Sequence, residues 1–137
     1  MSAVLKDAPQ LSPMRESDLD EVMAIERAIY SHPWTRGNFV DSINAGYECR
    51  CLRLVGELVG YFVLMVAAQE AHLLNLSIAA PSQRRGYGSD LLREAADLAR
   101  RLAAREYAQG RVVDPADAQP VYLRDKVALT LAEQQRR

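Results

Sequence analysis

A short loop of arginine and glycine is the part of this sequence best suited to chemistry. Residues 83–88 read Gln-Arg-Arg-Gly-Tyr-Gly, between an apolar stretch that ends near Ile78 and a long segment with helical periodicity. The N-terminus of a helix offers unpaired N–H groups and partial positive charge, and glycines let an anion approach the backbone closely. Arginines at the same place add charged hydrogen-bond donors. The spacing therefore predicts a binding site for phosphate or diphosphate.

Three kinds of phosphate-binding loop compete for this stretch. A Walker A loop requires Gly-x4-Gly-Lys-Ser/Thr, and no lysine stands in this loop. A dinucleotide-binding loop requires a third glycine, where this chain has Leu91, and it follows its strand directly, whereas Gly86 lies eight positions after Ile78. The third pattern, Gln/Arg-x-x-Gly-x-Gly/Ala, is satisfied by residues 83–88.

This third pattern leads to a family resemblance. Residues 71–92 resemble the coenzyme A signature of the GNAT acetyltransferase superfamily, and residues 11–102 are similar to its ribosomal-protein-alanine N-acetyltransferase branch, the RimI type. Three features carry the narrower resemblance: Glu16-Ser17-Asp18-Leu19, Pro33-Trp34-Thr35 followed by Phe39, and Leu74-Asn75-Leu76-Ser77-Ile78. The resemblance implies an α/β (α+β) fold with a mixed, mainly antiparallel sheet flanked by helices. It also implies acetyl-CoA as cosubstrate and no metal.

The resemblance also implies which residues hold acetyl-CoA. The backbone of the strand that ends at Ile78 is expected to pair with the pantetheine arm, and the glycine loop is expected to hold the pyrophosphate. The expected cofactor-binding residues are Leu76, Ser77, Ile78, Arg84, Arg85, Gly86, Tyr87, Gly88 and Ser89.

The reaction that the resemblance implies is direct attack of an amine on the thioester. A base takes a proton from the amine, and an acid, often a tyrosine, protonates the departing thiolate. The sequence assigns neither group. Tyr122 is a candidate for the acid, but it stands in Pro-Val-Tyr-Leu-Arg without the Gly-Phe that the family places after its tyrosine. Packing or surface exposure is the simpler interpretation of Tyr122.

Hydrophobic periodicity predicts the elements that position the loop. Strands are expected at 11–15, 48–55, 58–68 and 72–78, and helices from Ser17 to about Tyr30, from Thr35 to near Gly46, and from Gly86 to Leu102. Ser17 and Thr35 are the expected N-caps of the first two helices. In the strand 72–78, alternation places Leu74, Leu76 and Ile78 on one face and Leu73, Asn75 and Ser77 on the other. Two interpretations of Trp34 stay open: a wall of the substrate groove, or a core residue at a helix corner.

After Leu102 the strand, tyrosine helix and closing strands of the family are not recognisable. We therefore expect a leader at 1–10, a partial GNAT domain at 11–103 that is truncated after its cofactor-binding helix, and a foreign tail at 104–137. Residues 118–128 are similar to the tail of TsaB-type proteins of tRNA threonylcarbamoyladenosine biosynthesis, which makes a tRNA-modification protein a candidate partner. Truncation is also expected to leave the strand 58–68 with an unpaired edge, which favours a homo-oligomer.

Composition bounds the function classes. The chain has 137 residues, 49% hydrophobic and 26% charged, with a formal net charge of −1, which gives no global electrostatic case for direct nucleic-acid binding. Locally, residues 84–111 hold seven arginines against four acids, which suits a small polyanion. Cys49 and Cys51 are expected to be reduced packing residues. The longest apolar stretch, 58–68, is too short for a bilayer, and no signal peptide is recognised, so a cytoplasmic protein without membrane contact is expected.

Together these observations favour an acetyl-CoA-dependent N-acetyltransferase that acts on the N-terminal alanine amine of a ribosomal protein. Two alternatives remain. One is an acyl-CoA-binding module without turnover, and the other is a partner-binding protein linked to tRNA threonylcarbamoyladenosine modification.

Overall fold

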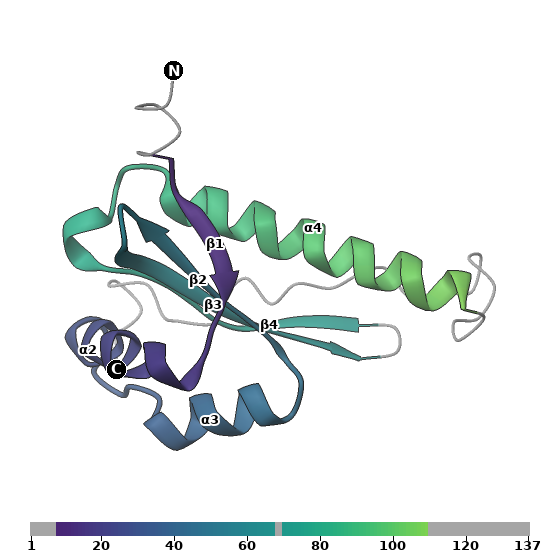
Figure 1. The fold of residues 1–137 in the computed structure, drawn as a ribbon, viewed down its shortest axis with the longest axis horizontal. Helices are drawn as coiled ribbons and strands as arrows, with labels where there is room; N and C mark the ends of the chain where they lie inside the picture. The colour runs from purple at the N-terminus through teal and green to yellow at the C-terminus, as the bar shows by residue number, and fades with distance from the viewer. Residues whose placement is uncertain (1–7, 68–69, 110–137) are drawn as a thin grey trace, which may run out of the picture.

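The computed structural model describes residues 8–67 and 70–109, and this part of the chain contains the elements that position the glycine loop. In chain order they are β1 (Gln10–Pro13), η1 (Glu16–Asp18), α2 (Leu19–Ile29), α3 (Arg36–Asn44), β2 (Glu48–Leu54), β3 (Glu57–Ala67), β4 (Glu70–Ile78), η2 (Ala80–Ser82) and α4 (Tyr87–Ala108) (Figure 1). Every strand and helix expected from periodicity is present. The residues from 110 onward, including Tyr122 and most of the expected tail, lie outside the described part.

The four strands form one sheet in the order β1-β2-β3-β4, and each neighbouring pair is antiparallel. The expected fold class is therefore confirmed, with an antiparallel sheet throughout the described ranges. The prediction of an unpaired edge on the strand 58–68 is wrong, because β3 lies between β2 and β4 and is the most buried strand. Within the described residues the free edge beside the glycine loop belongs to β4.

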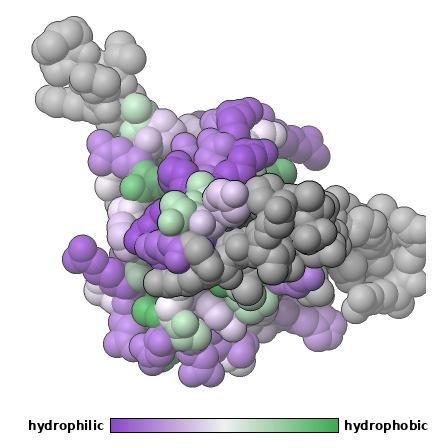
Figure 2. All heavy atoms as spheres, turned by 90° about the vertical axis from the view of Figure 1, so that its right-hand side faces the viewer, coloured by the Kyte–Doolittle hydropathy of each residue, from purple (hydrophilic) through white to green (hydrophobic). Residues whose placement is uncertain are grey.

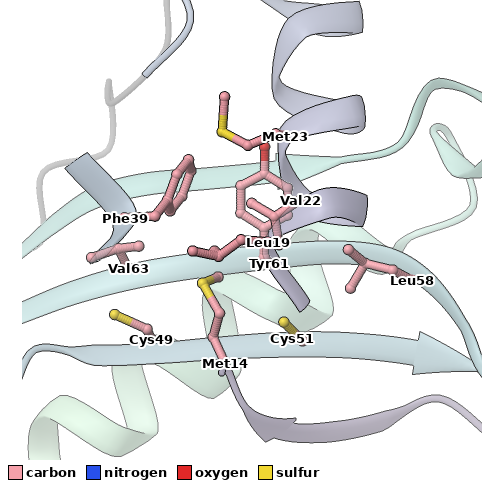
Figure 3. Close-up of a cluster of buried hydrophobic side chains, with 10 residues drawn as sticks. All are labelled: Met14, Leu19, Val22, Met23, Phe39, Cys49, Cys51, Leu58, Tyr61 and Val63. Carbon is pink, nitrogen blue, oxygen red and sulfur yellow. The ribbon is translucent and has the colours of Figure 1, made fainter. Parts of the chain in front are cut away.

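Helices cover both faces of this sheet, α2 and α3 on one face and α4 on the other (Figure 1). On the first face, Leu19 and Val22 of α2 and Phe39 of α3 are buried against Tyr61 and Val63 of β3 (Figure 3). On the opposite face, one side of α4 packs against the sheet through Leu91, Ala95 and Ala99. Side chains along β3 point alternately into these two cores, so both faces of the strand are buried and its sequence is nearly continuously apolar.

Local sequence explains where the helices begin and end. Thr35 caps α3 as expected, since its Oγ1 accepts a hydrogen bond from Asn38 N–H at 3.1 Å and Asn38 Oδ1 accepts one from Thr35 N–H at 3.0 Å. Ser17 is not the cap of the first helix, because it lies within η1, where Asp18 Oδ2 accepts from Arg15 N–H at 2.8 Å. Helix α4 continues past Leu102 to Ala108, through alanine and arginine residues that favour helix. The expected boundary at residue 103 thus falls inside a helix.

The two cysteines are free and buried on β2, as expected of packing residues. Burial raises the pKa of the Cys49 thiol to about 11 and that of Cys51 to about 12, so both remain protonated at neutral pH. Hydrophilic residues prevail on the face shown in Figure 2, around small separate hydrophobic ones. No helix in the described ranges is long and apolar enough to cross a membrane.

Candidate functional site

The loop before α4 has an unusual backbone. Gly86, the N-cap of α4, has φ +87°, and Arg84 has φ +64°, so two residues of the loop adopt the left-handed conformation. A side chain built at Gly86 would meet no atom within 4 Å, which leaves the backbone angle as the reason for glycine there. Left-handed residues beside right-handed ones turn successive N–H groups toward one concave surface, which suits an anion.

The N-terminus of α4 keeps its donors available. The first hydrogen bond of this turn runs from Asp90 N–H to Gly86 O at 3.1 Å, and no side chain caps the helix, so the N–H groups of Tyr87, Gly88 and Ser89 have no intrahelical partner. Arg84 and Arg85 are exposed, and neither pairs with an acid of the described chain.

One nearby carboxylate opposes this positive charge. Asp90 lies in the first turn of α4, and its Oδ1 accepts a hydrogen bond from Arg93 at 3.2 Å, which partly neutralises it. Backbone donors, two free guanidinium groups and open space together fit a diphosphate.

The adjacent edge of β4 offers backbone groups of its own. Ala79 N–H donates to Val59 O at 2.9 Å, and alternation along an antiparallel ladder then directs the N–H and C=O groups of Ser77 toward β3 and those of Leu76 and Ile78 outward. The backbone groups of Ser77 are therefore used within the sheet. Leu76 and Ile78 hold the outward-facing groups.

Gln83 connects the loop to this strand. Its Nε2 donates to Ile78 O at 2.9 Å, the last carbonyl of β4. At Gly88 an added Cβ would lie 3.8 Å from Ile78 Cγ1, so the start of α4 packs against the same strand end. The glycine loop and the free edge of β4 are therefore adjacent halves of one candidate site.

A bulge in β4 overturns the expected division of its side chains between faces. Val63 pairs with Asn75 and Leu64 pairs with Leu73, which leaves Leu74 as an extra residue. The extra residue reverses the alternation, so Leu73 joins Leu76 and Ile78 on the α4 face, while Leu74 packs with the core on the α2 face. Asn75 and Ser77 also face α2.

Beside these residues α2 carries a buried carboxylate. Glu26 is 1% exposed, and its Oε1 accepts hydrogen bonds from Tyr61 Oη at 2.6 Å and Asn75 Nδ2 at 3.1 Å. Its Oε2 accepts from the backbone N–H of Trp34 at 2.9 Å. Three donors thus converge on one carboxylate, which joins α2, the segment between α2 and α3, and two strands.

The hydrogen bonds continue from Asn75 to the edge of the sheet. Ser77 Oγ donates to Asn75 Oδ1 at 2.8 Å, and the hydroxyl of Tyr30 lies 2.7 Å from Ser77 Oγ and donates to Leu76 O at 3.3 Å. We call Glu26, Tyr61, Asn75, Ser77 and Tyr30 the Glu26 network. Burial raises the pKa of Tyr30, and burial also raises the pKa of Tyr61. Both hydroxyls therefore keep their protons at neutral pH.

The Glu26 network was not foreseen as part of a site. Its signal in the sequence is an acid at the i+7 position of a stripe that begins Leu19, Val22, Met23, where a further apolar residue would be expected. Tyr61 is likewise a residue with a polar group inside an otherwise apolar strand. Their meeting with Asn75 required the fold.

The two interpretations of Trp34 both retain support. Its ring packs on Phe39 with centroids 5.1 Å apart, at the border of the α2 core. It also lines an open pocket of about 420 Å³, together with Asn38, Asp41, Ser42, Ala45 and Tyr47. No group of three or more histidine, cysteine or acidic residues that could hold a metal occurs among the described residues.

Comparisons with known proteins agree with this geometry. Residues 19–124 match the acetyltransferase (GNAT) family. A Bacillus subtilis (strain 168) protein named for alanine N-acetylation of ribosomal protein bS18 is 26% identical over 120 residues, which are 86% of this chain and 80% of that protein.

Solved structures show the same fold. The ribosomal-protein-S18-alanine N-acetyltransferase of Escherichia coli has a TM-score of 0.67 at 21% identity, over 94% of this chain and 76% of its own. The PaiA N-acetyltransferase of Thermoplasma acidophilum, solved with coenzyme A, has a TM-score of 0.61 at 17% identity, over 69% of this chain and 73% of its own. Since the family match spans more than half of the sequence and the fold agrees, this chain belongs to the GNAT family of acetyltransferases.

Proposed function

We propose that this acetyltransferase moves the acetyl group of acetyl-CoA to the α-amine of a protein N-terminus, with an alanine of a ribosomal protein as the acceptor. The observation that carries the proposal is the two-part site, in which the donors of the loop before α4 adjoin the free edge of β4. The B. subtilis and E. coli relatives are named for this reaction, which supports the choice of acceptor.

The residues of the chain divide the work of binding. Arg84 and Arg85 and the N–H groups from Gly86 to Ser89 would hold the pyrophosphate, and the outward groups of Leu76 and Ile78 would orient the pantetheine amides. Ser77 would shape the site through its side chain, which belongs to the Glu26 network, while its backbone groups face β3. Tyr87, whose ring packs against the α4 core, would act through its backbone.

The bound cosubstrate would supply an activated acetyl carbonyl as a thioester. The amine nitrogen of the acceptor attacks that carbonyl carbon, a C–N bond forms, and the C–S bond breaks to release the thiolate of coenzyme A. The amine loses one proton in the process, and we assign neither the group that accepts it nor the acid that protonates the thiolate.

Two further proposals concern the setting of the protein. An acceptor on a ribosomal protein implies action in the cytoplasm, where ribosomes are made. The partner linked to tRNA modification depends on residues 104–137 and stays a prediction. The homo-oligomer also stays a prediction, although the unpaired edge of the strand 58–68 no longer supports it.

Binding is tested with a pair of matched glycine variants. Gly86 and Gly46 both have left-handed backbones, at φ +87° and +82°, and both have open space beside them. Gly86→Asp places a carboxylate against the phosphate site, whereas Gly46→Asp introduces the same strain after α3. Acetyl-CoA at 100 times its dissociation constant should stabilise the wild type and Gly46→Asp by about 2.7 kcal/mol in thermal unfolding, and should not stabilise Gly86→Asp. Equal stabilisation of both variants would refute the assigned loop.

Turnover is tested with an alanine-starting peptide. Release of free thiol and addition of one acetyl group to the peptide N-terminus are expected. Stabilisation by acetyl-CoA without product would instead identify an acyl-CoA-binding module.

A further inference from the structure

The hydroxyl of Tyr30 marks where the Glu26 network reaches the free edge of β4. Tyr30 follows the last residue of α2 and is half-buried, and its oxygen contacts both Leu76 O and Ser77 Oγ. Leu76 also holds one of the outward backbone N–H groups of the proposed cofactor edge. A ligand that binds along that edge therefore meets the Tyr30 hydroxyl. The direction of the hydroxyl proton decides whether Tyr30 can donate a hydrogen bond to the ligand or accept one from it.

That direction follows from Glu26. A carboxylate only accepts hydrogen bonds, so the Asn75 amide must turn its NH₂ group toward Glu26 Oε1, which leaves Asn75 Oδ1 facing Ser77. An amide oxygen also only accepts. Ser77 must therefore donate its single hydroxyl proton to Asn75.

The same reasoning fixes Tyr30. With its proton committed to Asn75, Ser77 Oγ can only accept the hydrogen bond at 2.7 Å, so Tyr30 is its donor. The second contact of Tyr30 is the carbonyl of Leu76 at 3.3 Å, which also only accepts, so the single proton of Tyr30 lies between these two acceptors and closer to Ser77. The proton of Tyr30 thus points into the protein, and its oxygen has only acceptor capacity left for a ligand.

We propose that Tyr30 Oη accepts a hydrogen bond from the attacking amine of the acceptor, and that Glu26, Asn75 and Ser77 are positioning residues that fix this polarity. This inference rests on the proposed function. An amine that donates one N–H to Tyr30 is oriented at the edge of β4, with its lone pair free for the thioester carbonyl. Because its proton points away from the ligand, Tyr30 is not the acid that protonates the thiolate.

The test is a four-corner cycle of two proteins and two peptides. Wild type and Tyr30→Phe are each titrated with an alanine-starting peptide and with the same peptide in which hydrogen replaces the α-amine. Coenzyme A, which cannot react, is present at saturation, and calorimetry gives each dissociation constant. Loss of one hydrogen bond should weaken the amine peptide roughly 3- to 10-fold in Tyr30→Phe and leave the amine-free peptide unchanged.

A matched control removes a hydroxyl elsewhere. Tyr107 is 52% exposed near the end of α4, about 30 Å along the helix from the glycine loop. Tyr107→Phe should bind both peptides as the wild type does. Equal weakening of both peptides by Tyr30→Phe would indicate a merely structural tyrosine and overturn the inference.

A second variant tests the polarity itself. In Glu26→Gln the new amide can donate a hydrogen bond to Asn75, so the Asn75 amide can turn its NH₂ group toward Ser77. Ser77 can then donate its proton to Tyr30 Oη. That bond occupies the acceptor position of Tyr30 that the amine would use. We expect the amine peptide to lose affinity as in Tyr30→Phe while coenzyme A affinity stays unchanged, and unchanged amine affinity in both variants would overturn the proposal. If the wild type acetylates the peptide but Tyr30→Phe weakens the amine peptide no more than the amine-free peptide, the role of Tyr30 is refuted and the proposed function stands. If the wild type binds coenzyme A and neither peptide, the proposed acceptor fails with it.

Discussion

Replacing Glu26 by alanine tests the structural reasoning independently of any activity. The substitution removes both carboxylate oxygens and leaves three donors without their acceptor: the Tyr61 hydroxyl, the Asn75 amide and the Trp34 backbone N–H. Tyr61 is 0% and Asn75 3% exposed, so water reaches these two with difficulty. Trp34 is only partly buried, so we expect a smaller cost at its N–H.

The size of the effect follows from this count. A buried donor left unsatisfied costs about 1–3 kcal/mol, so two sealed donors cost about 2–6 kcal/mol. A water molecule in the space left by the side chain recovers part of that cost. We therefore expect Glu26→Ala to lower the free energy of unfolding by about 3 kcal/mol, a large share of the stability of a small domain.

Urea unfolding followed by Trp34 fluorescence measures this loss. Trp34 is the single tryptophan of the chain, and its backbone N–H bonds to Glu26, so the probe reports on the network. The control is Glu21→Ala, since Glu21 is half-exposed and pairs with Arg53 at 2.9 Å, and its loss should cost less than about 1 kcal/mol. If Glu26→Ala cost no more than Glu21→Ala at an unchanged m-value, the network would not hold these elements together.

Three other changes give separate tests. Gly60→Ala should destabilise the protein by about 1–3 kcal/mol in thermal unfolding, because the new Cβ would lie 2.6 Å from Ile78 Cδ1 and 2.8 Å from a backbone oxygen of β4. Cys49 and Cys51 should resist Ellman's reagent at pH 8 until denaturant is added. Since burial raises their pKa values to about 11 and 12, unfolded thiols ionise first as the pH rises through about 9. The free energy of unfolding measured in urea should therefore fall by about 1.4–2 kcal/mol per thiol at pH 10. Gln83→Ala should weaken acetyl-CoA binding roughly 2- to 10-fold in calorimetry, through loss of its bond to Ile78 O, and unchanged affinity would contradict the coupling of loop and strand.

The elements of this fold were predictable because each depends on residues close in sequence. The Thr35 cap, the apolar stripe of α2 and the long periodic run of α4 are local signals, and the structure places all three where they were expected. The glycine loop is local in the same sense, since the groups proposed to bind phosphate are the N–H groups of consecutive residues. A motif of six residues is therefore enough to indicate it.

The features that escaped prediction depend on pairing between distant segments. The bulge at Leu74 is a mismatch between β3 and β4, and nothing in β4 alone shows that its alternation reverses there. With regular alternation Leu73 would share a face with Asn75 and Ser77. The bulge is what places a buried asparagine and serine next to Glu26 while Leu73 stays in the α4 core.

The two halves of the candidate site differ in the same respect. The glycine loop, which we call the phosphate half, depends on neighbouring residues, whereas the edge of β4, which we call the acyl half, depends on distant ones. The proposed phosphate half consists of consecutive residues at one helix start, so its geometry is set locally. The acyl half is held at its end by Gln83 and along its length by a hydrogen-bond chain from Glu26, 49 positions before Asn75. Because every bond of that chain has a forced direction, an isosteric change such as Glu26→Gln can alter recognition at Tyr30 without moving the cofactor loop. Affinity for coenzyme A and recognition of the amine should thus be separable by mutation in this protein.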